Sequence, residues 1–151
     1  MKKTWKKVVS LLMSVMVVFS MMGVPVMAEE AKAAPTEVAS CTASGLWTKV
    51  LNFAFEDTAW MNAINSVTVN GTVYTNKTIS SFGSDTNIWD IGSATGAYGS
   101  YTALRIVSPD TYPLTVDITA AGYQKLTMQV TKTTVSYQDV YTATVVPQQP
   151  V

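Results

Sequence analysis

The chain has 151 residues, ten basic and ten acidic side chains, one cysteine and no histidine. The length fits a single domain, and one cysteine excludes an intrachain disulfide. Without histidine the chain lacks the commonest general base, the Ser–His and Cys–His nucleophile pairs and the usual zinc ligand sets. We therefore expect no enzyme, no catalytic residue, no metal site and no cofactor.

The first 28 residues have the pattern of a secretory signal peptide. Four lysines lie within the first seven positions, an apolar run covers residues 8–22, and Val-Met-Ala at 26–28 fits a small-residue cleavage site. An uncleaved anchor is the alternative, because the run is nearly long enough to span a bilayer. Gly23 and Pro25 favour cleavage. We expect a bacterial protein that is secreted, extracellular or associated with the cell surface.

The charge of the chain becomes acidic when this leader is set aside. Four of the ten basic residues lie before residue 29 and all ten acidic residues lie at or after it, which leaves a net charge of −4. An acidic chain without a basic run is a poor binder of nucleic acid and of anionic membranes. We expect neither partner, and no stable membrane insertion after cleavage.

Residues 29–44 are rich in Ala, Glu, Thr and Ser and show no apolar periodicity, which predicts a flexible linker. Within it, Val-Ala-Ser-Cys at 38–41 resembles a lipoprotein acceptor site. Charged residues separate Cys41 from the apolar run, however, so we favour an unmodified thiol. Residues 147–151 are expected to be a tail. The β-rich binding module is then predicted at residues 45–146.

Inside this module the apolar residues recur mostly every second position, which is the period of a strand with one buried face. Threonine, valine and tyrosine, which favour strands, are abundant. We predict an all-β fold, a small antiparallel β-sandwich-like domain with one short helix near its N-terminus. The alternating apolar positions are Leu51, Phe53, Phe55, Val67, Val69, Leu114, Val116, Ile118, Ala120, Leu126, Met128 and Val130.

The helix is predicted from Thr58 to Ile64, with Asp57 as its cap and Trp60 as the side chain that anchors it to the sheet. A long irregular segment is expected at residues 80–100, followed by a strand at 101–107. Long loops in compact domains are often functional.

Two hairpins are predicted from turn chemistry. Asn70-Gly71 suits a two-residue type I′ turn, because both of its central positions need a positive φ. The sequence Ala-Gly-Tyr at 121–123 suits a three-residue loop. Only an odd loop places the apolar residues of both flanking strands on one face, with Ile118 opposite Leu126.

Residues 55–72 and 114–123 resemble a known bacterial family, the haemoglobin-interacting domain of Shr-like haem-uptake proteins, formerly a domain of unknown function. The matching features are Trp60, Ile64, Val-Thr-Val-Asn-Gly at 67–71 and Ala-Ala-Gly-Tyr at 120–123. The resemblance spans residues 48–131. It implies a module of secreted or surface proteins of Gram-positive bacteria and, for the Shr case, binding of host haemoglobin. No binding residue of the family maps onto this chain.

Three aromatic residues around the long segment, Trp89, Tyr98 and Tyr101, are candidate ligand-binding residues, because exposed aromatics suit binding surfaces. Packing into the core is the alternative for each. Asp85 and Asp90 do not have the spacing of a calcium loop, and we interpret them as turn residues.

Haem has few candidate axial ligands in a chain without histidine. The remaining choices are Met61, Met128, Cys41 or a tyrosine, and Tyr137 and Tyr141 have the spacing of a haem-binding tyrosine pair. We interpret the tyrosines as two residues on one sheet face and Met128 as part of the core.

The leading hypothesis is a protein-interaction or adhesion module whose partner is a host or bacterial surface protein, haemoglobin among them. A carbohydrate- or cell-wall-binding module is the alternative, and a structural spacer is the third.

Overall fold

The computed structural model describes residues 30–45, 49–80, 83–107 and 111–147. The predicted signal peptide and most of the predicted tail lie outside these residues. The chain divides into two units, Met1–Glu30 and Ala31–Val151, and the second unit is the folded part described below.

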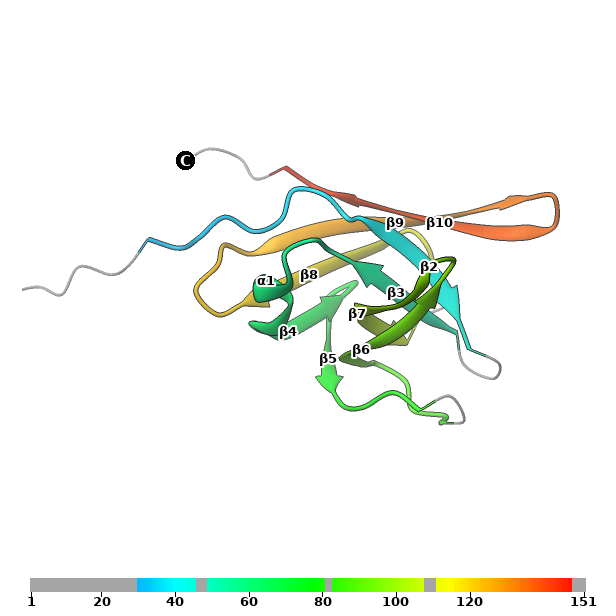
Figure 1. Cartoon of the computed structure of the whole chain (residues 1–151), viewed down its shortest axis with the longest axis horizontal. Coiled ribbons are helices and arrows are strands. Elements are labelled where there is room, and N and C mark those ends of the chain that lie inside the picture. Colours follow the sequence, from blue (N-terminus) through cyan, green and yellow to red (C-terminus); the bar gives the residue numbers. More distant parts are fainter. Residues whose placement is uncertain (1–29, 46–48, 81–82, 108–110, 148–151) are drawn as a thin grey trace, which may run out of the picture. The chain divides into compact units, whose positions relative to one another are not determined.

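The described residues of this unit are mostly β-structure, in one mixed sheet with a single helical turn (Figure 1). The strands follow the order β10-β9-β8-β4-β5-β6-β7-β3-β2 across the sheet. The elements are β2 (Ser40–Ser44), β3 (Val50–Ala54), α1 (Thr58–Asn62), β4 (Ile64–Val69), β5 (Thr72–Asn76), β6 (Ile88–Gly96), β7 (Gly99–Val107), β8 (Leu114–Ala120), β9 (Leu126–Val135) and β10 (Gln138–Val145).

The sheet differs in one respect from the antiparallel arrangement that we expected. β5 is antiparallel to β4 but parallel to β6, so it joins two antiparallel halves into a continuous mixed sheet. The two outermost strands, β10 and β2, approach each other, and the sheet is nearly closed. The prediction of a purely antiparallel sheet was wrong because the apolar pattern within a strand does not encode whether its neighbour runs parallel or antiparallel to it.

The core lies between the two halves of the sheet. One cluster of buried residues unites Phe53 and Leu104 from one half with Val116, Leu126 and Met128 from the other. The predicted alternation of β8 and of β9 up to Val130 is confirmed, because every second residue there is buried. Each buried Leu, Val, Ile or Met side chain contributes about 1.5–3 kcal/mol when it leaves water.

Both predicted hairpin registers are confirmed. Asn70 and Gly71 have φ values of 49° and 84°, and Val69 pairs with Thr72 across the turn. In the other hairpin Ile118 pairs with Leu126, and Gly122 takes a φ of 83°. Turn chemistry and one-sided burial together fix these registers.

The segment after Asp57 forms one helical turn, which stops at Asn62, because Ile64 already begins β4. The Asp57 carboxylate accepts a hydrogen bond from the backbone N–H of Trp60 at 2.9 Å. Trp60 is fully buried and meets the Phe55 ring edge to face at 4.7 Å. A five-residue helix is unstable alone, so packing of Trp60 holds it.

Two segments that we expected to be irregular are ordered strands. Within the expected irregular segment at 80–100, residues 88–96 form β6 and residues 99–100 begin β7, and the glycine, serine and threonine content concealed the strand period. The strand predicted at 101–107 is the remainder of β7. The predicted linker at 29–44 contributes β2, which pairs with β3. Ahead of it, Lys32 donates its N–H to Gly122 and accepts one from Gln124, at 2.9 and 2.8 Å.

Candidate functional site

The outer half of the β9–β10 hairpin extends beyond the rest of the sheet (Figure 1). We call residues 131–140 the arm. All ten of its residues are exposed, whereas β9 before the arm alternates buried and exposed positions. A two-stranded ribbon without a core is marginally stable in water. The arm is thus a surface that the fold itself does not need for burial.

The outer face of the arm is uncharged. The register of β9 and β10 defines an outer face that continues the solvent side of the sheet, and its described residues carry no charge. Val135 and Val140 are 58% and 44% exposed there. The outer-face residues of the arm are Thr131, Thr133, Val135, Gln138 and Val140.

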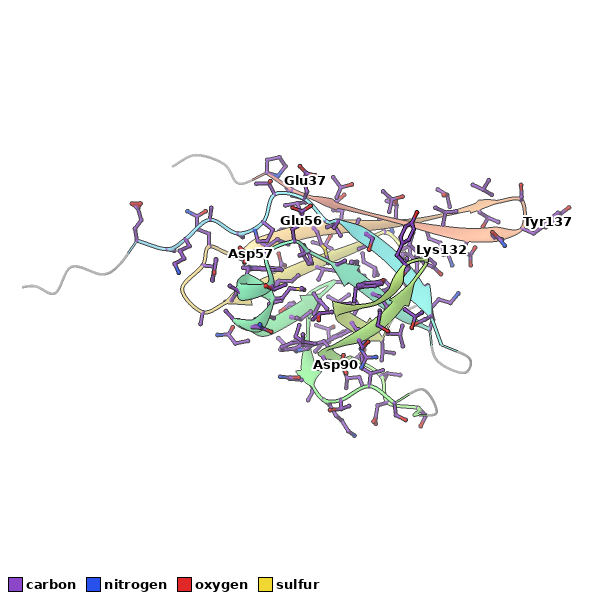
Figure 2. The ribbon with its side chains drawn as sticks, in the orientation of Figure 1. Glu37, Glu56, Asp57, Asp90, Lys132 and Tyr137 are labelled. Carbon is purple, nitrogen blue, oxygen red and sulfur yellow. The ribbon has the colours of Figure 1, made fainter. Side chains whose placement is uncertain are left out.

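The tip of the arm holds a tyrosine in an unfavourable backbone conformation. Val135 pairs with Gln138, which leaves Ser136 and Tyr137 as a two-residue loop with φ values of 51° and 66°. A left-handed conformation costs a non-glycine residue about 1–2 kcal/mol. Tyr137 is fully exposed at the end of the arm, as Figure 2 shows. Strain of this kind is concentrated at functional sites in proteins.

The base of the arm is fixed by a cluster of tyrosines and lysines. The Tyr141 and Tyr112 rings pack at 5.7 Å, and the Lys49 ammonium lies 5.6 Å from the Tyr141 ring centre. The Lys132 ammonium lies 5.1 Å from the Tyr112 ring centre. A hydrogen bond to Tyr141 raises the pKa of Lys49, with a smaller contribution from Asp139, 4.0 Å away. These contacts orient the arm relative to the sheet.

The three aromatic candidates from the sequence do not share one surface. Trp89 is only 2% exposed, because it lies on the inner face of β6 within the core. Tyr98 is fully exposed in the β6–β7 turn. Tyr101 is half-buried, and its hydroxyl lies 3.2 Å from the hydroxyl of Thr42.

The remaining haem candidates are likewise separated. Met61 and Met128 are buried in the core. Tyr137 lies in the turn at the tip of the arm, whereas Tyr141 is buried at its base, so the pair does not share a face as expected.

The interpretation of Asp90 as a turn residue was wrong, because Asp90 lies buried in β6. Both aspartates form ion pairs. Asp85 pairs with Lys77 at 2.9 Å, and Asp90 pairs with Arg105 at 2.6 Å. Among the described residues, no group of three or more His, Cys, Asp or Glu side chains is suited to hold a metal ion.

Cys41 lies in β2, opposite Phe53, and packs against the core rather than lying in a linker. Burial raises the pKa of its thiol to about 12. Because the thiolate is the reactive form, this thiol is a poor nucleophile at neutral pH.

Comparisons with known proteins add no relative. No protein-family model matches the chain, and neither the curated proteins nor the solved structures contain a match. Within the described residues, no helix has both the length and the apolar character needed to cross a membrane.

The arm was not predicted from the sequence. The alternation of Thr and Val in residues 126–145 is a strand signal, but Ser136-Tyr137 contains none of the residues that favour a two-residue turn. The signal that could have identified the arm was Tyr137, an aromatic residue midway between two strand-like segments. Val135, Tyr137 and Val140 are its exposed apolar residues.

Proposed function

We propose that this protein is an exported bacterial module that binds another protein through its arm. The observation that carries the proposal is an exposed ten-residue ribbon with a strained, fully exposed Tyr137 at its tip. Export is supported by the basic, apolar and small-residue pattern of residues 1–28. The resemblance to haemoglobin-interacting domains makes haemoglobin the first partner to test.

The chemistry of the arm suits a protein surface better than a charged ligand. Its outer face combines β-branched side chains without charge, and tyrosine supplies a large contact area with little loss of conformational freedom. Tyrosine is also among the residues that dominate binding energy at interfaces. Sheet modules commonly bind through such projecting turns and exposed strands.

The sandwich-like arrangement that we predicted from the strand period, with a short helix near its N-terminus, is part of this proposal. The common core between the two antiparallel halves of the sheet supports a sandwich-like description. The parallel contact of β5 with β6 is the one respect in which the sheet departs from a purely antiparallel sandwich.

A binding assay with purified haemoglobin tests the proposal directly. Residues 29–151 are immobilised, and haemoglobin is titrated to micromolar concentrations with serum albumin as the negative control. We expect saturable binding that weakens at least tenfold in Tyr137→Ala, the loss typical of a central interface aromatic.

Tyr98→Ala is the matched control, because Tyr98 is also fully exposed in a hairpin turn but lies outside the arm. Equal affinity of both variants and the wild type would exclude the arm as the binding surface. Absence of binding at micromolar haemoglobin would exclude haemoglobin as the partner.

A further inference from the structure

A second surface, distant in sequence from the arm, is an open edge inside the sheet. β5 pairs with β6 at only two positions, Thr75 with Ile88 and Asn76 with Trp89. β6 then continues to Gly96, paired with β7 on its other side. No strand of the described residues pairs with β6 on the β5 side beyond Trp89. An interior edge of this kind presents unpaired main-chain groups.

The hydrogen bonds between the two strands show which groups are open. Asn87 and Trp89 accept bonds from the N–H groups of Thr75 and Lys77, at 2.9 and 3.0 Å. Alternate residues of β6 therefore direct their main chain toward β5, and Ile91 is the next of these. The chain after Lys77 turns away, because the N–H of Ile79 bonds to the Asp90 carboxylate at 2.8 Å. The N–H and C=O of Ile91 consequently face an empty strand position.

A hollow of about 470 Å³ lies at this edge. Ile64, Trp89 and Ile91 supply apolar lining, while Asn62, Asn76 and Thr78 supply polar side chains. Asparagine and threonine both donate and accept hydrogen bonds, as peptide groups do.

The only charged side chains in the lining neutralise each other. Arg105 donates two hydrogen bonds to Asp90, at 2.7 and 2.6 Å. Its guanidinium lies flat across Gly92, where an added Cβ would come within 2.6 Å of a guanidinium nitrogen. It also donates to the carbonyl oxygen of Ser93 at 3.3 Å, the next edge-facing residue after Ile91. The open stretch is therefore short and its surroundings have no net charge.

We propose that this hollow binds a short, uncharged, extended segment of a partner polypeptide, which adds to the β6 edge by pairing its main chain with Ile91. Main-chain pairing gives such a site its affinity, and the neutral lining favours peptides without charged residues. This site is separate from the arm and does not depend on it.

The test uses residues 29–151 labelled with ¹⁵N and a library of N-acetylated hexapeptide amides composed of uncharged residues. We expect the amide signals of Ile91 and its neighbours to shift on titration. Ile91→Pro removes the edge-facing N–H without removing a bond to β7 and should abolish the shift, whereas Ile91→Val should retain it. No shift at millimolar library, or an undiminished shift in the folded proline variant, overturns the proposal.

A second variant covers the case in which Ile91→Pro does not fold. Asn76→Ala removes one polar side chain of the rim and should weaken the peptide-induced shift about fivefold, the loss expected for one hydrogen bond. An unchanged affinity in this variant, or a response to neutral oligosaccharides at the same amides without one to peptides, contradicts a peptide site. Tyr137→Ala should leave the peptide response unchanged, so the result is independent of haemoglobin binding.

Discussion

Two hairpins of this protein close with two-residue turns of positive φ, but they use very different residues. The β4–β5 turn uses Asn70 and Gly71, and the β9–β10 turn uses Ser136 and Tyr137, with positive φ at all four residues. Asparagine and glycine adopt this conformation readily, whereas tyrosine does not. A turn built only for stability resembles the first, so the unfavourable residues of the second are what our proposal of a binding role for Tyr137 accounts for.

The surroundings of the two turns sharpen this contrast. The Asn70 side chain accepts a hydrogen bond from the Thr115 N–H at 2.8 Å, and its own N–H bonds to the Thr115 carbonyl. The β4–β5 turn is thus attached to β8. The Ser136-Tyr137 turn lies at the end of an exposed ribbon.

The largest effect on the free energy of unfolding is expected when a substitution in the buried part of β9 is compared with one in the arm. Met128→Ala, at a fully buried position, should lower the free energy of unfolding by about 2–5 kcal/mol, because it leaves a cavity in the core. Val135→Ala in the arm should change it by less than about 0.5 kcal/mol. Urea unfolding measures both. Similar losses in the two variants would mean that the arm is part of the folding core.

Placing tyrosine in the favourable turn should reproduce the strain of the unfavourable one. Gly71→Tyr should lower the free energy of unfolding by about 1–2 kcal/mol, because the φ of 84° is costly for a side chain. An added Cβ meets no atom within 4 Å there, so the cost comes from the backbone alone. Gly71→Ala is the control and should show a similar loss.

The reverse exchange should separate stability from binding. Ser136→Asn combined with Tyr137→Gly should raise the free energy of unfolding by about 1 kcal/mol, because both residues then suit a type I′ turn. The same variant should bind haemoglobin at least tenfold more weakly. A variant that is stabilised and binds normally would remove the functional reason for Tyr137.

The smallest expected effect on stability is at the base of the arm, where Lys49 titrates at alkaline pH. Because the pKa of Lys49 is raised in the folded state, its contribution is complete below the ordinary value of 10.5 and is lost as the pH rises through the folded value. Lys49→Met should reduce the alkaline loss of stability by less than about 0.5 kcal/mol, since the side chain is half-exposed. Thermal unfolding between pH 9 and 12 measures the difference, and an identical pH dependence would contradict it.

Features encoded locally were predictable from the sequence. The alternation of β8 and β9 fixed their faces, and Asn70-Gly71 identified its own turn. The parallel contact between β5 and β6 was not predictable, because strand partners are selected by packing across the whole fold. Trp89 was considered for binding from its polar neighbours, yet strand alternation directs it into the core.

The candidate surfaces were harder to predict than the core. The turn at Tyr137 lacks the Asn, Asp and Gly residues that indicate a two-residue hairpin turn, so the arm was not recognised as a hairpin. The hollow beside Ile91 arises where β5 stops and β6 continues, which is a relation between strands rather than a pattern within one.

The contacts of Lys32 and of β2 have a practical consequence for truncation. A fragment that begins at Gly45, the boundary suggested by composition, would lack the strand that pairs with Val50–Ala54. The main-chain groups of β3 would then be uncovered along one side, inviting intermolecular association. Expression of the domain should begin no later than Ala31, so that the attachment of Lys32 to the β8–β9 turn is preserved.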